Sequence, residues 1–222
     1  MKATKRFSST GCFSRWLTQV IRNLICAALV TTSVLFASCG GGATKSGAIN
    51  ISKEIDYKIL GDEAELRKIY EGIVQKMGAD SKFVEKLSIS ISRPSERGDG
   101  NQKDALQIIL QQIHPTNRNK LREYMFWSSE GEWSSGQTLE IDLIGGDAAS
   151  FRLEENLMDL SGLTVERLYK ISQEAFRKYK SDSYSYQYVS DILIKDDIIT
   201  IYIKGRLSAN ELVKSETYKV NL

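Results

Sequence analysis

Hydrophobic residues in the segment 54–222 follow two spacings, and the order of these spacings predicts the fold. After Asp62, apolar residues recur every three or four positions, which is the spacing of a surface helix with one buried face. Asp62 and Glu65 form a capping-box pattern at the start of this helix, and Gly78 is a suitable terminator. The residues predicted to face the core are Leu66, Ile69, Tyr70, Ile73 and Met77.

Strand spacing follows this helix. Leu87, Ile89 and Ile91 alternate with serines, which predicts a strand with one buried face. The apolar positions of residues 105–113 suit either a helix or a strand. We favour a strand, because the segment is short and is stopped by Pro115.

Two further segments are predicted to form a hairpin. Residues 121–128 and 138–143 flank the turn sequence Glu130-Gly131-Glu132. Alternation in the second segment also accounts for its carboxylates, so we assign them no acid–base role. Its residues expected to face the core are Leu139, Ile141 and Leu143, with Glu140 and Asp142 facing outward.

The same order of elements then occurs a second time. A helix is predicted over 165–180, with strands over 184–195, 198–206 and 213–222 and turns at 196–197 and 208–210. The repetition predicts an α+β fold with two tandem units, each with one helix packed on an antiparallel sheet of three or four strands. The first unit spans 54–146 and the second 164–222. Residues 147–163 form a connector whose apolar residues can pack against either unit.

A segment with a different pattern precedes both units. Five basic residues come before an apolar run at 24–38, and small residues stand directly before Cys39. The run is shorter than the ~20 residues needed to span a membrane, so residues 1–38 are predicted to be a cleaved export signal. Residues 39–53 are rich in Gly, Ser and Thr and are predicted to be a flexible tether. The alternative is an uncleaved anchor in which Cys39 is an ordinary thiol.

Removal of the signal changes the charge balance and the available chemistry. The five basic residues leave with it, so 25 Lys and Arg remain against 28 Asp and Glu, a net charge of −3. Nucleic acid is therefore not an expected partner. His114 is the only histidine, expected at a strand end beside a turn, and Cys39 would be the only cysteine left. These residues cannot build a His/Cys zinc site or a His-based triad, so we predict no metal, no cofactor and no enzyme.

The residues just described carry two resemblances. The segment before Cys39 resembles a bacterial lipoprotein signal, in which Cys39 is lipidated. The stretch Leu110–Trp127 with Trp133, and Leu157–Leu163 before a helix, resemble a pattern in Bacteroidetes-type outer-membrane lipoproteins. The helix-plus-sheet units are also loosely similar in shape to PepSY-like modules and to the repeats of β-lactamase inhibitor proteins. None of these resemblances carries over an active site.

The lipoprotein resemblance implies a location. It implies a lipid anchor at Cys39 in the outer membrane. The periplasmic face is favoured over the cell surface, because no acidic residue follows Cys39 before Glu54.

Aromatic residues near one hairpin and along one strand are the candidate binding residues, because Trp and Tyr are enriched among interface anchors. The alternative for both groups is a role in covering the core. The function expected is a protein-binding or assembly module of the cell envelope with an envelope protein as partner. The alternatives are an inhibitor or immunity-type lipoprotein and an enzyme that processes envelope glycans. The candidates are Trp127, Trp133, Tyr184, Tyr186 and Tyr188.

Overall fold

The computed structural model describes residues 4–6, 49, 51–94, 103–144 and 151–222. The chain divides into two units, of which the first joins Met1–Lys45 to Ile141–Gly146. In this unit β1 (Thr4–Arg6) pairs antiparallel with β6 (Asp142–Ile144). Strand β1 belongs to the predicted export signal, so we expect this pairing only before cleavage. Cys39 and the rest of the predicted signal lie outside the described residues.

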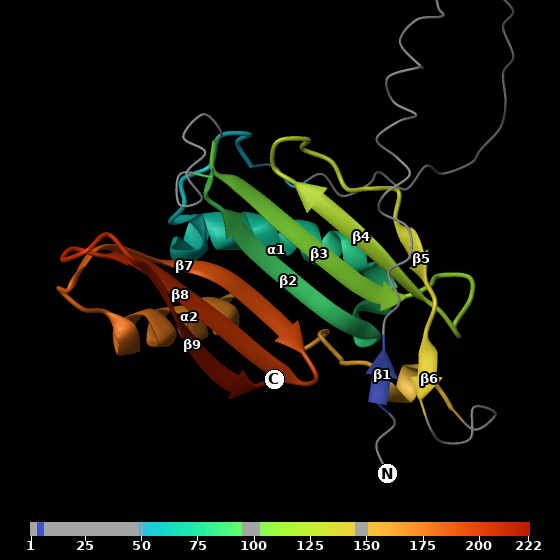
Figure 1. The fold of residues 1–222 in the computed structure, drawn as a ribbon. Helices are drawn as coiled ribbons and strands as arrows, with labels where there is room; N and C mark the ends of the chain where they lie inside the picture. The colour runs from blue at the N-terminus through green and yellow to red at the C-terminus, as the bar shows by residue number, and fades with distance from the viewer. Residues whose placement is uncertain (1–3, 7–48, 50, 95–102, 145–150) are drawn as a thin grey trace, which may run out of the picture. The chain divides into compact units, whose positions relative to one another are not determined.

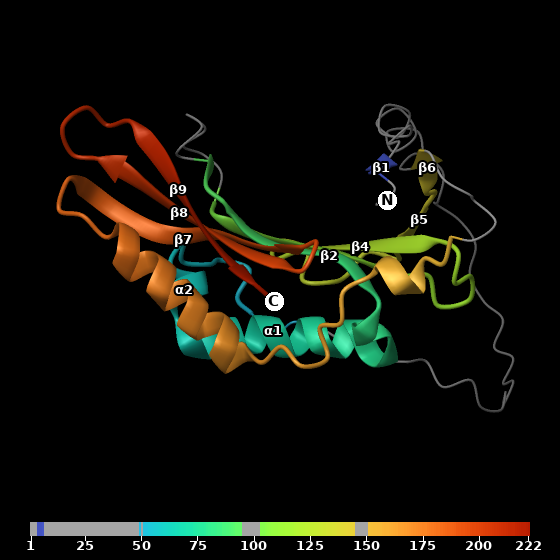
Figure 2. The ribbon, with the colours of Figure 1, turned by 90° about the horizontal axis from the view of Figure 1, so that it is seen from below.

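The described residues of the second unit, Ser46–Glu140 with Asp147–Leu222, form one seven-stranded antiparallel sheet, two α-helices and short 3-10 turns. The strand order is β5-β4-β3-β2-β7-β8-β9 (Figure 1). Both helices lie against the same face of the sheet, and no helix among the described residues covers the other face (Figure 2). The strands are β2 (Val84–Ser92), β3 (Ala105–Ile113), β4 (Leu121–Trp127), β5 (Gln137–Leu139), β7 (Tyr184–Lys195), β8 (Ile198–Leu207) and β9 (Val213–Asn221), and the helices are α1 (Glu63–Met77) and α2 (Val165–Tyr179).

Both helices begin at the residues whose side chains can cap them. The Asp62 side chain accepts a hydrogen bond from the backbone N–H of Glu65 at 3.0 Å, and Thr164 caps α2 in the same way. Helix α1 ends at Gly78, where φ is 57°, a conformation that glycine adopts without strain. The predicted stripe of α1 is confirmed, because all five of its residues are buried.

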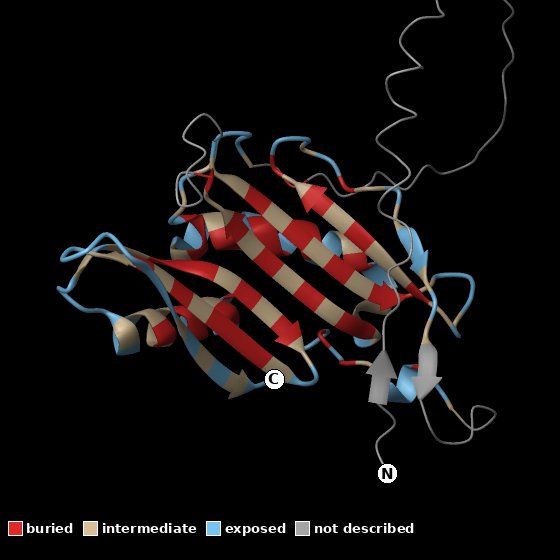
Figure 3. Ribbon diagram, in the orientation of Figure 1, coloured by how far each residue is buried: buried red, intermediate tan, exposed pale blue. Residues whose placement is uncertain are grey.

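The alternating residues of the strands form one core between the sheet and the helices. Figure 3 shows buried and partly buried residues alternating along β2, β3, β7 and β8. Ile89 pairs with Ile108 on one side and with Ile192 on the other, and all three are fully buried. The segment 105–113, which suited either element, is a strand. The α+β class with antiparallel strands is confirmed, and the strands of this larger unit form one continuous sheet, because β2 pairs with β7.

The predicted strand at 138–143 is wrong in its extent. Strand β5 ends at Leu139, after three pairs with β4 at the edge of the sheet. Glu140 then pairs with Lys120 on the surface at 2.7 Å, and the chain passes into the other unit at Ile141. Neither Leu139 nor Ile141 is buried, so this segment does not contribute a core strand. Because a strand at a sheet edge has a neighbour on one side only, its alternating apolar side chains are less fully covered than those of an interior strand.

The core also includes one residue of the predicted tether and residues of the connector. Ile49, within the predicted tether, is 4% exposed and lies so close to Gly72 that a Cβ there would come within 2.5 Å of Ile49 Cγ1. The described end of the tether is therefore packed against α1. In the connector, Met158 forms a β-bridge with Val84, and Leu160 is buried. The connector thus packs against the first half of this unit.

Tyr70 joins α1 to this connector and generates a testable pH dependence. Its hydroxyl donates a hydrogen bond to the Leu163 carbonyl at 2.8 Å, and burial raises the pKa of Tyr70 to about 12. An unfolded tyrosine ionises near pH 10, so the folded state holds this proton more tightly than the unfolded state. The stability from Tyr70 is complete below pH 10 and is lost as the pH rises from about 10 to about 12.

We therefore expect the stability difference between the wild type and Tyr70→Phe to depend on pH. At pH 7 the variant should be about 1 kcal/mol less stable, because it lacks the hydrogen bond. Above pH 10 the wild type should lose stability relative to the variant by up to about 1.4 kcal/mol per pH unit. Urea denaturation of both proteins from pH 7 to pH 11.5 measures this. A difference that stays constant over the whole range would contradict the role given to Tyr70.

Candidate functional site

The largest aromatic cluster surrounds the side chain of Arg93, just beyond the end of β2. The Arg93 guanidinium carbon lies 3.9 Å from the ring centroid of Tyr57, 4.9 Å from that of Tyr186 and 5.5 Å from that of Tyr188. The three rings also contact one another, with centroids 5.0 to 6.2 Å apart. Cation–π attraction in such a partly desolvated cluster contributes about 1–2 kcal/mol. We call these four residues the tyrosine clasp.

The tyrosine clasp connects three distant parts of the chain. Tyr57 lies in the segment before α1, Arg93 follows β2, and the other two tyrosines lie on β7. Arg93 also forms an ion pair with Asp104, at 3.3 Å, in which both side chains are less than one-fifth exposed. The alternating sequence of β7 pointed to Tyr186 and Tyr188, whereas Tyr57 and Arg93 follow no spacing that points to this strand. Asp104 compensates the charge of Arg93, and the three rings pack against one another. These contacts within the cluster favour a structural role.

The three tyrosines of β7 do not share one face, so the expectation of three rings side by side is corrected. A register shift lies between Tyr184 and Tyr186 in the pairing with β8. Tyr184 packs over Gly205, where a Cβ would come within 2.6 Å of the Tyr184 ring. Tyr186 instead pairs with Arg206 and belongs to the clasp. The extra residue of a bulge reverses the alternation of a strand, and this separates Tyr184 from its neighbours.

Trp133 lies in the core at the hairpin end of the sheet. It is 8% exposed, forms a β-bridge with Phe126, and has its ring centroid 5.6 Å from that of Phe126. Two hydrogen bonds between Met125 and Ser134 hold the loop back against β4. This is the arrangement of a residue that closes the core. Trp127 lies on the opposite face of β4 and is only partly buried.

The face of the sheet opposite the helices carries a band of apolar residues. Strand register places Met125 beside Ile109, Ile109 beside Ser88, and Ser88 beside Leu193, across four strands. All four are partly buried, as are Trp127 and Tyr202 in the next row of the sheet. Polar residues flank the band, including an ion pair of 3.8 Å between Lys204 and Asp191. We call this surface the open face, defined by Met125, Ile109, Ser88, Leu193, Trp127 and Tyr202.

His114, the only histidine of the sequence, lies in the turn that follows β3. His114 Nδ1 accepts hydrogen bonds from the backbone N–H groups of Thr116 and Asn117, at 3.3 and 3.2 Å. This histidine therefore stabilises the turn after β3, as expected. Within the described part of the chain, no group of three His, Cys, Asp or Glu residues could hold a metal ion. The described helices also include none that is long and apolar enough to cross a membrane.

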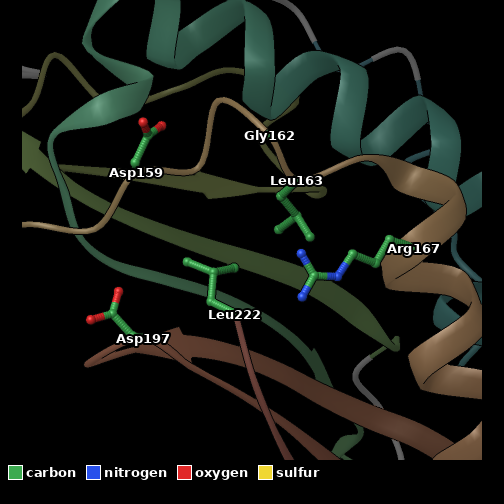
Figure 4. A pocket seen from close by; sticks show the side chains of 6 residues that line it. All are labelled: Asp159, Gly162, Leu163, Arg167, Asp197 and Leu222. Carbon is green, nitrogen blue, oxygen red and sulfur yellow. The ribbon is translucent and has the colours of Figure 1, made fainter.

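One cavity lies where α2 begins, beside the end of β9. It has a volume of about 360 Å³. Figure 4 shows the Arg167 guanidinium reaching between Leu163 and Leu222, with the carboxylates of Asp159 and Asp197 set apart from it. Hydrogen bonds from Ser161 lower the pKa of Asp159, which is therefore engaged with its own turn. The cavity contains none of the candidate binding residues.

The different positions of the two tryptophans lead to a prediction about stability. Trp133→Ala should lower the free energy of unfolding by about 3–5 kcal/mol, because a large buried ring leaves a cavity. Trp127→Ala is the matched control, and it should cost roughly half as much or less, because less of its area is buried. Urea denaturation followed by circular dichroism measures both. Equal losses for the two variants would contradict the placement of Trp133 in the core.

No protein-family model, no curated protein and no solved structure matches this chain.

Proposed function

We propose that this chain is a non-enzymatic binding or assembly module that recognises another protein of the cell envelope through the open face. The observation that carries the proposal is the row of partly buried residues on the open face, in which β4, β3 and β7 contribute apolar side chains and β2 contributes Ser88. A sheet face that only contacts water is expected to carry polar residues, and on β2 this expectation holds, because Ser88 lies between the apolar residues of β3 and β7. Met125, Ile109 and Leu193 depart from that expectation.

The composition of the open face suits a protein partner. A central apolar band with charged and polar residues around it is the usual arrangement of a protein interface. Trp127 adds one of the residue types that most often anchor such interfaces. The face lies on a sheet with a packed core behind it, so binding would order few additional side chains. Trp127 therefore remains a candidate anchor of the open face, whereas Trp133 lies in the core and is not part of that face.

A duplicated unit is also part of the proposal. Each helix is followed by an antiparallel series of strands, α1 by β2 to β5 and α2 by β7 to β9. Strand β2 is the first strand after α1 and β7 is the first after α2, and these two strands pair in antiparallel orientation. Two copies of one helix-and-strands unit, related by an approximate two-fold axis through this pair, account for both facts. An inhibitor or immunity-type protein is the second candidate, favoured by this tandem arrangement with one continuous sheet.

The lipid anchor of this proposal rests on the sequence before Cys39. A basic leader, an apolar run and small residues before a cysteine support cleavage and lipidation at Cys39, and attachment to the periplasmic face of the outer membrane. Several acyl chains, at ~0.8 kcal/mol for each buried methylene, would hold the protein far more firmly than one chain. The anchor would then present the open face to partners in the envelope.

Replacement of the cysteine tests the anchor. We expect Cys39→Ser to move the protein from the outer-membrane fraction to the soluble fraction of the envelope, because no acyl chain can then be attached. Fractionation of cells expressing each form, with immunoblotting, measures the distribution. Cys26→Ser, within the signal, is the matched control and should leave the distribution unchanged. Retention of Cys39→Ser in the membrane would contradict lipidation at this residue.

Site-specific photocrosslinking tests the open face. A photoreactive amino acid at Ser90, on β2 of the open face, should give a discrete crosslinked product in intact cells. The same amino acid at Glu71 or Lys170, exposed on α1 and α2, should not. Trp127→Ala should weaken the Ser90 product, and its immunoblot intensity measures the effect. A product from the helix positions but not from Ser90 would place the partner on the other side of the molecule.

A further inference from the structure

A second group of cations and aromatic rings lies between the last turn of α1 and the hairpin of β4 and β5. The Lys76 ammonium is 4.1 Å from the centroid of the Tyr124 ring and 5.8 Å from that of Trp133. The Arg122 guanidinium carbon is 5.5 Å from the same Tyr124 ring. Two positive groups therefore gather at one ring, on the face of the sheet that the helices cover.

These two cations have no counter-ion among the described residues. The basic residues nearest to them along α1, Arg67 and Lys68, each pair with a glutamate at 3.2 Å or less. Neither Lys76 nor Arg122 has a carboxylate within 4 Å in the described part of the chain. Burial and, to a lesser extent, the charge of Arg122 lower the pKa of Lys76. Partly buried charges without a partner are costly, so such a pair favours an added negative charge.

The same cluster contains hydrogen-bond donors that no described residue satisfies. The Arg122 Nε and the Trp133 Nε1 atoms are both buried and lack an acceptor within the described residues. Trp133 is more than nine-tenths buried, and one other Arg122 nitrogen, Nη2, donates to the Ser135 carbonyl at 2.6 Å. Buried donors are rarely left without a partner in proteins. An anion that accepts hydrogen bonds would neutralise the excess positive charge and would also pair with the unused N–H groups.

We propose that Lys76 and Arg122, with the Trp133 indole, form a binding site for an oxyanion, a phosphate or a carboxylate group. Arg122 offers planar N–H donors and Lys76 a point charge, the two kinds of group that usually hold such anions. The hydrogen bond to Ser135 and the close approach of Gly136, where φ is 81°, fix the guanidinium against the hairpin loop. The site lies on the opposite side of the sheet from the open face, so it is independent of the proposed protein interface.

Two simpler accounts of these cations exist. Lys76 lies in the last turn of α1, where a positive charge favours the unpaired carbonyl groups. Long cationic side chains also commonly cover neighbouring rings with their aliphatic stems, and both residues here lie near the ring of Tyr124. Neither account explains why two positive charges lie at one ring or why the indole N–H has no acceptor. Neither account predicts saturable anion binding. A titration with anions therefore separates a binding site from a structural role.

Nuclear magnetic resonance of the full chain in detergent provides this titration. The chain has three tryptophans, so its indole N–H region has three peaks, and Trp133→Phe identifies the peak of Trp133. Sodium phosphate or sodium acetate is added at pH 7 and at constant ionic strength, set with sodium chloride. We expect a saturable shift of the Trp133 indole peak, and none for Trp16 or Trp127.

The variants decide which residues bind the anion. Lys76→Gln and Arg122→Gln should each weaken binding at least tenfold, and Lys76→Arg should retain it, because the charge remains. Lys68→Gln is the matched control on α1 and should bind as the wild type does. Saturation by phosphate alone identifies a phosphoryl ligand, and saturation by acetate as well identifies a carboxylate. No saturable shift, or an affinity in Lys76→Gln and Arg122→Gln equal to that of the wild type, would overturn the proposal while leaving the open face untouched.

Discussion

The pairing of β2 with β7 is the interaction on which the rest of the larger unit depends. Five residue pairs join the two strands, and on the helix side these include Leu87 with Ile194 and Ile89 with Ile192. All four of these side chains are fully buried, so the strand pair forms the centre of the core. Without it, each half would have a sheet with one more unpaired edge and a smaller core, and small sheets of this kind are marginally stable. The continuous open face also exists only because these strands pair.

Local patterns predicted the elements well because their causes are local. The caps at Asp62 and Thr164 depend on a side chain and a backbone N–H three residues away. The tight turn at Asp196 and Asp197, both with positive φ, likewise depends on residue types that tolerate this conformation. Strands with one buried face showed their alternation directly, as in β2.

The features that the sequence did not predict depend on contacts between distant segments or on single inserted residues. Periodicity contains no information on which strands pair, so the single sheet was not predicted. The bulge in β7 separates Tyr184 from Tyr186 without any change in the alternating sequence. Tyr57 and Arg93 are unremarkable in their own segments, and only the folded chain brings them together. The hairpin sequence was compatible with either a core or a surface position for Trp133. The loop folds back so that Trp133 forms a bridge with Phe126, and this places it in the core.

The position of the tyrosine clasp determines how the molecule would respond to a pulling force. If the chain is held through its N-terminal segment, tension enters the fold at Ile49 and at Tyr57. Tyr57 contacts Arg93, just after β2, and two tyrosines of β7, so the load would pass to these two strands. Both β2 and β7 lie in the interior of the sheet. The clasp therefore connects the segment before α1 to interior strands of the sheet and not to an edge strand. A load applied at this end would reach the interior strands before it reached β5 or β9, the two strands with a free edge.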